Sequence, residues 1–287
     1  MSKNEKKFKP NSPPHAIHIG GRMGRQLYNH RIEMMDNFYP QVRVDEEASV
    51  LGVAHILNQL CGNMLINHPV YDMKCMINHF VGPSAAYLMA CGRYAEDFLK
   101  AVRLHVSKNN KILNVGAGFG LASVLAAQCS ENLVLAVEPY PELHSLIQGN
   151  AKENNVNIKV IQGCLVAGEK GGMCHLYVDE DVWGASIYKD ISGGTGAEII
   201  NVPIVTLQSL LQDYDVDTVL IDAPGGELSL LEEHQELSAI NKLIVRINKA
   251  FMRGENSLPK FMKSMRNAGL YVENVVGDVY VFSRDMK

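Results

Sequence analysis

Residues 111–125 read KILNVGAGFGLASVL, and this stretch decides the fold. Its apolar start, Ile112 to Val115, leads into three alternating glycines and then into a run of helix-forming residues, which is the pattern of a strand, a tight turn and a helix. Glycine has no Cβ and accepts a positive φ, so the backbone of such a turn can approach a bound molecule closely. The stretch predicts a ligand-binding turn; a structural turn without a ligand is the alternative.

The spacing of the three glycines indicates which ligand the turn binds. Gly116, Gly118 and Gly120 form G-x-G-x-G, whereas a dinucleotide fold uses G-x-G-x-x-G, and Leu121 occupies the place of its third glycine. The turn therefore favours S-adenosylmethionine over a pyrophosphate cofactor.

A second strand supports a nucleoside ligand. The apolar run 133–137 stops at Glu138, and a carboxylate at the tip of the second strand can accept hydrogen bonds from both ribose hydroxyls. A solvated loop acid is the alternative interpretation of Glu138.

Beyond residue 110 the pattern alternates between strands and helices. The strands are predicted at 112–115, 133–137, 158–162, 218–222, 243–247, 271–275 and 279–283, and the helices at 121–129, 141–153, 207–213, 227–239 and 257–268. Such alternation requires a mostly parallel sheet with right-handed crossovers, while the last two strands are joined so closely across Gly277 and Asp278 that they must form a hairpin. We therefore expect an α/β fold, a Rossmann-like seven-stranded sheet with an antiparallel C-terminal hairpin.

One segment interrupts this alternation. Residues 171–203 contain the only tryptophan, Trp183, and are expected to form an extra hairpin or flap over the cofactor end of the sheet.

The N-terminal part of the chain has a different character. Residues 1–21 are polar and rich in proline, and we expect a flexible arm. Residues 22–106 carry apolar side chains at helical spacing, including a run over 84–104, which predicts an α-helical region. We expect this region to act as a cap on the acceptor side or as a homodimer contact, outside the cofactor site, and residues 107–287 to form the catalytic domain.

Composition limits the function classes. The chain has 287 residues, a formal net charge of −4, and no apolar run long enough to cross a bilayer or to serve as a signal peptide. We expect a cytoplasmic protein that binds small molecules, and neither nucleic acid nor membranes. The six cysteines form no C-x-x-C pair and the histidines show no metal-ligand spacing, so we expect reduced thiols and no metal.

The region from Lys111 to Arg284 resembles the FkbM family of S-adenosylmethionine-dependent methyltransferases. The resemblance is carried by NVGAGFG, AVEP, IQGCLVAGEKGG, VWGAS, VPIVTLQSLL and LIDAPGGELSLL. In members of that family, the run that corresponds to LIDAPGGELSLL usually contains the pattern aspartate, any residue, glutamate, glycine, small residue, glutamate. Asp222, Gly225, Gly226 and Glu227 keep this pattern, but Pro224 replaces the inner glutamate.

Asp222 can also be interpreted without the family. It ends the fourth predicted strand, next to the first in sheet order, so its carboxylate should face the crevice where open α/β sheets bind ligands. There it can orient the methionine ammonium or the nucleophile, or act as a base; a cap for the helix that follows is the alternative.

These arguments define the expected site. The expected cofactor-binding residues are Gly116, Ala117, Gly118 and Gly120 for the amino acid portion, Glu138 and Pro139 for the ribose, Cys164 and Leu165 for the adenine edge, and Asp222. The candidates for positioning the substrate or removing its proton are Asp222, Trp183 and His175.

The acceptor atom follows from what comes after Asp222. Amino-group methyltransferases use N/D-P-P-F/Y at this place, and here Asp222 is followed by Ala-Pro-Gly-Gly. Oxygen is therefore the expected acceptor on a small molecule. An N-methyltransferase, a nicotinamide-dependent oxidoreductase and a non-catalytic cofactor-binding protein are the alternatives.

Overall fold

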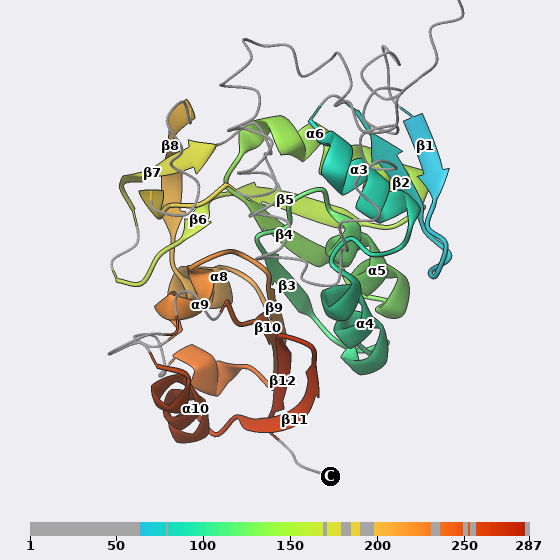
Figure 1. Ribbon diagram of the computed structural model, residues 1–287. Coiled ribbons are helices and arrows are strands. Elements are labelled where there is room, and N and C mark those ends of the chain that lie inside the picture. Colours follow the sequence, from blue (N-terminus) through green and yellow to red (C-terminus); the bar gives the residue numbers. More distant parts are fainter. Residues whose placement is uncertain are drawn as a thin grey trace, which may run out of the picture.

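The computed structural model describes residues 64–78, 80–168, 171–178, 185–189, 198–230, 236–248, 252 and 257–284, and its centre is a seven-stranded sheet with the order β11-β12-β10-β9-β3-β4-β5 (Figure 1). The strands are β3 (Ile112–Val115), β4 (Val134–Glu138), β5 (Ile158–Gln162), β9 (Thr218–Ile221), β10 (Lys242–Arg246), β11 (Tyr271–Val276) and β12 (Val279–Ser283). β12 is antiparallel to β10 and β11, and the other adjacent strands are parallel. The expected α/β fold with an antiparallel C-terminal hairpin is confirmed.

Helices cover both faces of this sheet (Figure 1). One face carries α4 (Glu96–His105), α5 (Leu121–Cys129) and α6 (His144–Glu153), and the other carries α8 (Leu207–Asp213) and α10 (Leu258–Asn267). Alternate residues of each strand belong to different cores: Ile112 packs with Phe98 of α4, whereas Leu113 packs with Leu207 of α8. This double burial explains why the central strands are apolar on both faces.

The apolar run over 84–104 forms two helices. α3 (Pro83–Ala90) and α4 are separated by a turn in which Gly92 has φ +71° and Ala95 has φ +49°. Left-handed backbone at these positions ends a right-handed helix, although the apolar spacing continues across the break.

The expectation of an α-helical region is wrong for residues 64–77. They form an antiparallel hairpin of β1 (Met64–Asn67) and β2 (Lys74–Ile77). In β2 the buried side chains are Cys75 and Ile77, with period two, and this alternation suits a strand with one face packed on α6.

Two asparagines, one in α6 and one directly after it, hold this hairpin. Asn150 Oδ1 accepts from the Met76 N–H at 2.6 Å, and Asn154 Oδ1 accepts from the Lys74 N–H at 2.8 Å. Asn150 also donates to the carbonyl of Phe119 in the glycine-rich turn at 2.8 Å. The N-terminal hairpin is thus connected to the ligand-binding turn through one buried side chain.

Several expectations concern residues outside the described ranges. The arm 1–21 and the helical segment 22–63 lie there, so their roles as arm, cap or dimer contact stay predictions. Of the predicted helix 227–239, the described parts are α9 (Gly226–Ser229) and a 3-10 turn (Glu236–Ala239).

The insert expected over 171–203 contains a hairpin, as predicted. β7 (Met173–Val178) pairs antiparallel with β8 (Glu198–Val205), and the short β6 (Cys164–Leu165) pairs parallel with β8 on its other edge. Residues 185–187 of the same insert line the cavity described below.

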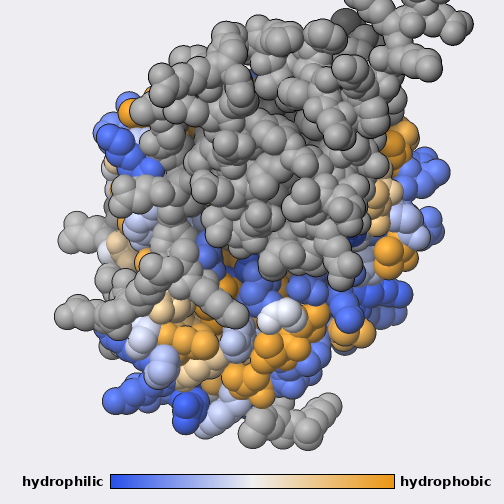
Figure 2. Space-filling model, viewed as in Figure 1, coloured by the Kyte–Doolittle hydropathy of each residue, from blue (hydrophilic) through white to orange (hydrophobic). Residues whose placement is uncertain are grey.

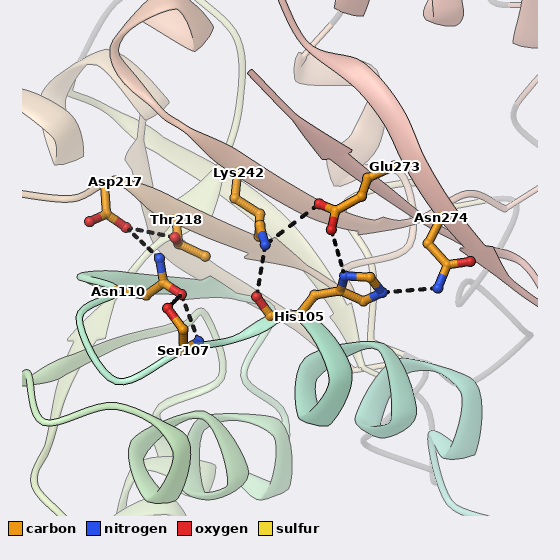
Figure 3. A network of polar contacts seen from close by, with 8 residues as sticks. All are labelled: His105, Ser107, Asn110, Asp217, Thr218, Lys242, Glu273 and Asn274. Carbon is orange, nitrogen blue, oxygen red and sulfur yellow. Dashed lines mark hydrogen bonds and ion pairs between the residues drawn. The ribbon is translucent and has the colours of Figure 1, made fainter. Parts of the chain in front are cut away.

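A polar network lies at the amino ends of the parallel strands (Figure 3). Lys242 Nζ donates to the carbonyl of His105 at 2.9 Å and lies 3.5 Å from Glu273 Oε2, while His105 Nδ1 lies 3.2 Å from Glu273 Oε1. These contacts attach the end of α4 to β10 and β11.

The surface is mixed where the structure describes it. In the lower part of Figure 2, over the C-terminal strands and α10, apolar and charged side chains are interspersed. Within the described ranges, no helix is long and apolar enough to span a bilayer.

Candidate active site

A cavity opens at the carboxyl ends of β3, β4, β9 and β10. This is the edge at which open α/β sheets bind their ligands, because the crossovers leave a crevice where the strand order changes direction. Its lining residues come from several parts of the chain, among them residues 94–95, the turn 115–118, the tip of β4 with 163–165, the insert residues 185–187, and the ends of β9 and β10.

The three glycines of the turn all have positive φ but have different surroundings. A Cβ on Gly116 would lie 2.6 Å from the carbonyl oxygen of Asp222, and one on Gly120 would lie 3.1 Å from Ile147. A Cβ on Gly118 would meet only the Tyr94 hydroxyl, at 3.7 Å. Gly116 and Gly118 line the cavity, whereas Gly120 is not among its lining residues and allows α6 to pack close to the turn.

Glu138 joins the tip of β4 to this turn. Its Oε2 accepts from the Gly118 N–H at 2.7 Å, and its Oε1 accepts from the Tyr140 N–H at 3.0 Å. The residue is only 5% exposed, and burial raises the pKa of its carboxyl group to about 7 against the lowering effect of these two hydrogen bonds. Since a carboxylate can accept about four hydrogen bonds, two acceptor positions remain for a ligand.

Asp222 follows β9 and is ion-paired. Arg246, the last residue of β10, donates through Nε to Asp222 Oδ1 at 2.8 Å and through Nη1 to Asp278 Oδ1 at 2.6 Å. The guanidinium also lies 5.8 Å from the centre of the Phe98 ring. Arg246 thereby fixes the orientation of the Asp222 carboxylate at the wall of the cavity.

Glu227, on α9, is a second buried acid in the cavity. It is 1% exposed, and its two oxygens accept from the N–H groups of Gly225 at 2.8 Å and Asn248 at 3.0 Å. Burial, opposed by the backbone hydrogen bonds and assisted by the charge of Asp222, raises its pKa to about 7. Among the described residues, neither Glu227 nor Glu138 forms an ion pair with a cationic side chain.

The other expected site residues lie in different places. Ala117, Pro139, Cys164 and Leu165 line the cavity. His175 is exposed on β7 and is not a lining residue. Trp183 lies outside the described ranges, as do other parts of the insert.

Several lining residues were not predicted from the sequence. Tyr94 and Ala95, between α3 and α4, line the cavity, so this turn of the N-terminal region reaches the candidate site, and its expected place on the acceptor side stays a prediction. The reason is that α4 packs on α5 and the C-terminal strands and brings its first residues to the glycine-rich turn. Arg246 was also missed, because it lies within the predicted strand 243–247, whereas in the structure β10 ends at this residue. Glu227 was noted only as part of the family pattern and not as a site residue.

The geometry and the sequence agree with one known family. The methyltransferase FkbM domain matches residues 114–269, more than half of the chain, and the protein belongs to this family. It is an S-adenosylmethionine-dependent methyltransferase.

Solved structures with a similar fold are distant. Precorrin-6y C5,15-methyltransferase from Geobacter metallireducens is 15% identical, with a TM-score of 0.39 over 66% of this chain and 87% of that one. Ribosomal protein L11 methylase from Lactobacillus delbrueckii is 15% identical, with a TM-score of 0.40 over 67% and 77%. A tRNA (uracil-54, C5)-methyltransferase from Pyrococcus abyssi, in complex with S-adenosyl-L-homocysteine, is 13% identical, with a TM-score of 0.41 over 77% and 43%. Because their TM-scores and sequence identities are low, these structures give no information about the substrate of this protein.

The cavity residues fit S-adenosylmethionine. A buried acid without a cationic partner is costly unless a ligand completes its hydrogen bonds, and Glu138 offers its free acceptor positions beside the open side of Gly118. The cavity also contains more acidic than basic side chains, which suits a ligand with a sulfonium and an ammonium group. Within the described ranges, no cluster of three or more His, Cys, Asp or Glu side chains could hold a metal ion.

Proposed function

We propose that this methyltransferase transfers the methyl group to a hydroxyl oxygen of a small-molecule acceptor. The observation that carries the proposal is the pair of carboxylates in the cavity, Asp222 directly after β9 and Glu227 on α9. A carboxylate accepts a hydrogen bond from a hydroxyl and can orient its oxygen towards the methyl group.

The order of the strands divides the cavity into two halves. Glu138 and residues 163–165 lie on the β4 and β5 side, and Glu227, Arg246 and Asn248 lie on the β10 side. The glycine-rich turn and Asp222 lie between them. We assign the first half to the nucleoside, with Glu138 and Pro139 at the ribose and Cys164 and Leu165 at the adenine, and the second half to the acceptor.

Bound S-adenosylmethionine supplies a methyl group that is already electrophilic, so the protein mainly has to align the reactants and exclude water. In our assignment Gly116, Ala117 and Gly118 bring the backbone close to the methionine portion. Asp222 orients the ammonium group or the acceptor, since Arg246 holds its carboxylate in place. Asp222 is thus better suited to positioning than to free movement as a base.

The insert supports a small acceptor. Ala185, Ser186 and Ile187 line the cavity, and Ser186 Oγ donates to the carbonyl of Pro224 at 3.1 Å, which attaches the insert to the loop after β9. Because the insert closes one side of the cavity, the cavity suits an acceptor that is small enough to be enclosed. The formal net charge of −4 also disfavours nucleic acid as the acceptor.

The test uses S-adenosylmethionine with a deuterated methyl group. The full chain is incubated with it and with matched pairs of small alcohols and amines, and separately with a metabolite extract, followed by mass spectrometry. We expect the label on oxygen in a small molecule, with equimolar S-adenosylhomocysteine. Label on nitrogen would favour the N-methyltransferase alternative, and label only in the RNA or protein fraction would refute a small-molecule acceptor.

A further inference from the structure

Glu227 has a different position in the cavity from Glu138, although the two carboxylates are alike in other ways. Both are nearly fully buried, both accept two backbone N–H groups, and neither forms an ion pair among the described residues. Glu138 belongs to the tip of β4, whereas Glu227 is held between the residues that follow β9 and β10. The central turn lies between them, so the two acids face different parts of the cavity.

Among the described residues, no unpaired cation compensates the charge on the Glu227 side of the cavity. Arg246 is the cationic residue in the described lining, and it forms ion pairs with Asp222 and Asp278. Ionised Glu227 therefore adds a negative charge to a group of side chains that is already acidic. A cation of the ligand is the natural partner for this charge.

The ligand of a methyltransferase changes its charge during turnover. S-adenosylmethionine has a positive sulfonium at the reacting centre, and the product S-adenosylhomocysteine has a neutral thioether there. The ribose, the adenine, the ammonium group and the carboxylate are common to both. A carboxylate near the reacting centre favours the first ligand, whereas a carboxylate at the ribose favours neither.

We propose that Glu227 is a specificity-determining residue, whose buried carboxylate makes this cavity prefer the cationic sulfonium of S-adenosylmethionine over the neutral thioether of S-adenosylhomocysteine. The inference rests on the proposed division of the cavity into a nucleoside half and an acceptor half. Its consequence is that the product binds more weakly than the substrate and leaves after transfer.

The test compares dissociation constants for the two ligands, measured by calorimetry on the full chain above the raised pKa of about 7. Glu227→Gln keeps the shape and one acceptor oxygen but removes the charge. We expect this variant to lose affinity for S-adenosylmethionine by on the order of tenfold, while its affinity for S-adenosylhomocysteine changes little. The preference for the sulfonium then falls by the same factor.

Glu138→Gln is the matched control, because it removes the charge of a similarly buried carboxylate that also accepts from two backbone N–H groups, those of Gly118 and Tyr140. It should weaken both ligands by similar factors and leave their ratio unchanged. If Glu227→Gln lowers the affinity for both ligands equally, the carboxylate acts on a group common to both, such as the ammonium group, and the proposal is overturned. If it changes neither affinity, the role of Glu227 is structural and the proposal is also overturned.

The wild-type protein supplies a second test, which does not depend on how a variant folds. Among the described residues, the charged groups that line the cavity with Glu227 are Asp222 after β9, Arg246 on β10, which is paired with Asp278, and Glu138 on the other side of the cavity. Lowering the pH through about 7 protonates Glu227, so the preference for S-adenosylmethionine should decline. The protonation of Glu138 cancels in the ratio, because the ribose is common to both ligands. A ratio that does not change with pH contradicts the proposal.

These outcomes separate the inference from the function on which it depends. Absence of binding by both ligands to the wild-type chain would refute the cofactor site itself. Binding of both with a ratio that neither Glu227→Gln nor pH changes would refute only the role of Glu227.

Discussion

The acidic side chains at the two ends of the sheet differ in their partners and in the direction of their pKa shifts. At the amino end, Glu273 contacts both Lys242 and His105 (Figure 3). Burial raises its pKa, but the charge of Lys242, the hydrogen bond of Ser283 and the contacts of His105 outweigh it, so the net shift is downward. At the carboxyl end, Glu138 and Glu227 have only backbone N–H partners among the described residues, and the pKa of each is raised to about 7.

This difference separates structural acids from binding acids. The acid at the amino end is satisfied by the protein itself and contributes to the attachment of α4. The acids at the carboxyl end keep unused acceptor positions in a cavity, where an uncompensated carboxylate costs free energy until a ligand supplies donors or positive charge.

The largest effect on cofactor binding is expected for Gly118→Val. A branched side chain would enter the cavity beside Glu138, and valine resists the φ of +54° found at this position. Binding of S-adenosylmethionine should fall by at least about a hundredfold, which is about 2.7 kcal/mol, as measured by calorimetry. Gly168→Ala is the control, because Gly168 also has a positive φ but its added Cβ would meet nothing within 4 Å. If Gly118→Val binds normally, the turn is structural only.

The stability of the ligand-free chain should depend on pH through the two buried acids. A free Glu has a pKa of 4.5, and both acids have a pKa of about 7 in the folded chain, so between these values the folded state binds more protons than the unfolded state. Stability from these groups is therefore complete below the unfolded pKa and is lost as the pH rises through about 7. The loss is on the order of 3 kcal/mol for each acid.

Urea unfolding measures this pH-dependent loss of stability. The wild type and the double variant Glu138→Gln, Glu227→Gln are compared at about pH 5 and about pH 8. The fall in the free energy of unfolding with rising pH should be smaller in the variant, since other titrating groups contribute equally to both. An equal fall in the free energy of unfolding in both proteins would mean that Glu138 and Glu227 do not cause the loss of stability with rising pH.

Glu138→Ala tests the ribose assignment. Charge-assisted hydrogen bonds to two hydroxyls are worth about 1.5–3 kcal/mol, so the affinity for S-adenosylmethionine should fall about ten- to a hundredfold. S-adenosylhomocysteine should lose affinity by a similar factor, because it contains the same ribose. Unchanged affinity in a folded variant would remove Glu138 from the site.

The smallest effect is expected at the amino end of the sheet. Glu273→Gln removes a charge that Lys242 and His105 compensate, and its side chain is 37% exposed. Solvent screening limits the loss of unfolding free energy to about 1 kcal/mol or less. The affinity for S-adenosylmethionine should not change. A large loss of affinity would show that the two ends of the sheet are coupled.

The sequence predicted the parts of this molecule that follow from local patterning. The glycine-rich turn, the acid after the second strand and the antiparallel hairpin at Gly277 and Asp278 are each encoded within a few residues, so periodicity and turn chemistry were sufficient. The hairpin at 64–77 was missed because its alternation extends over only four residues in each strand. The break at Gly92 was missed because the apolar spacing continues through it.

The rest of the site depends on contacts between distant segments. Tyr94 reaches the cavity because α4 packs on α5, and Arg246 meets Asp222 because β10 lies next to β9. The different surroundings of Gly116, Gly118 and Gly120 also depend on the tertiary structure, since Asp222 and Ile147 come from other parts of the chain. No pattern within a single segment carries this information.

The central claim is that the uncompensated acids at the carboxyl end of the sheet bind the cofactor. A crystal structure of the full chain with S-adenosylhomocysteine tests it most directly. The account predicts that both ribose hydroxyls lie within hydrogen-bonding distance of the Glu138 carboxylate, with the methionine portion against Gly118. A ligand bound elsewhere, or bound in the cavity with its ribose away from Glu138, would contradict it.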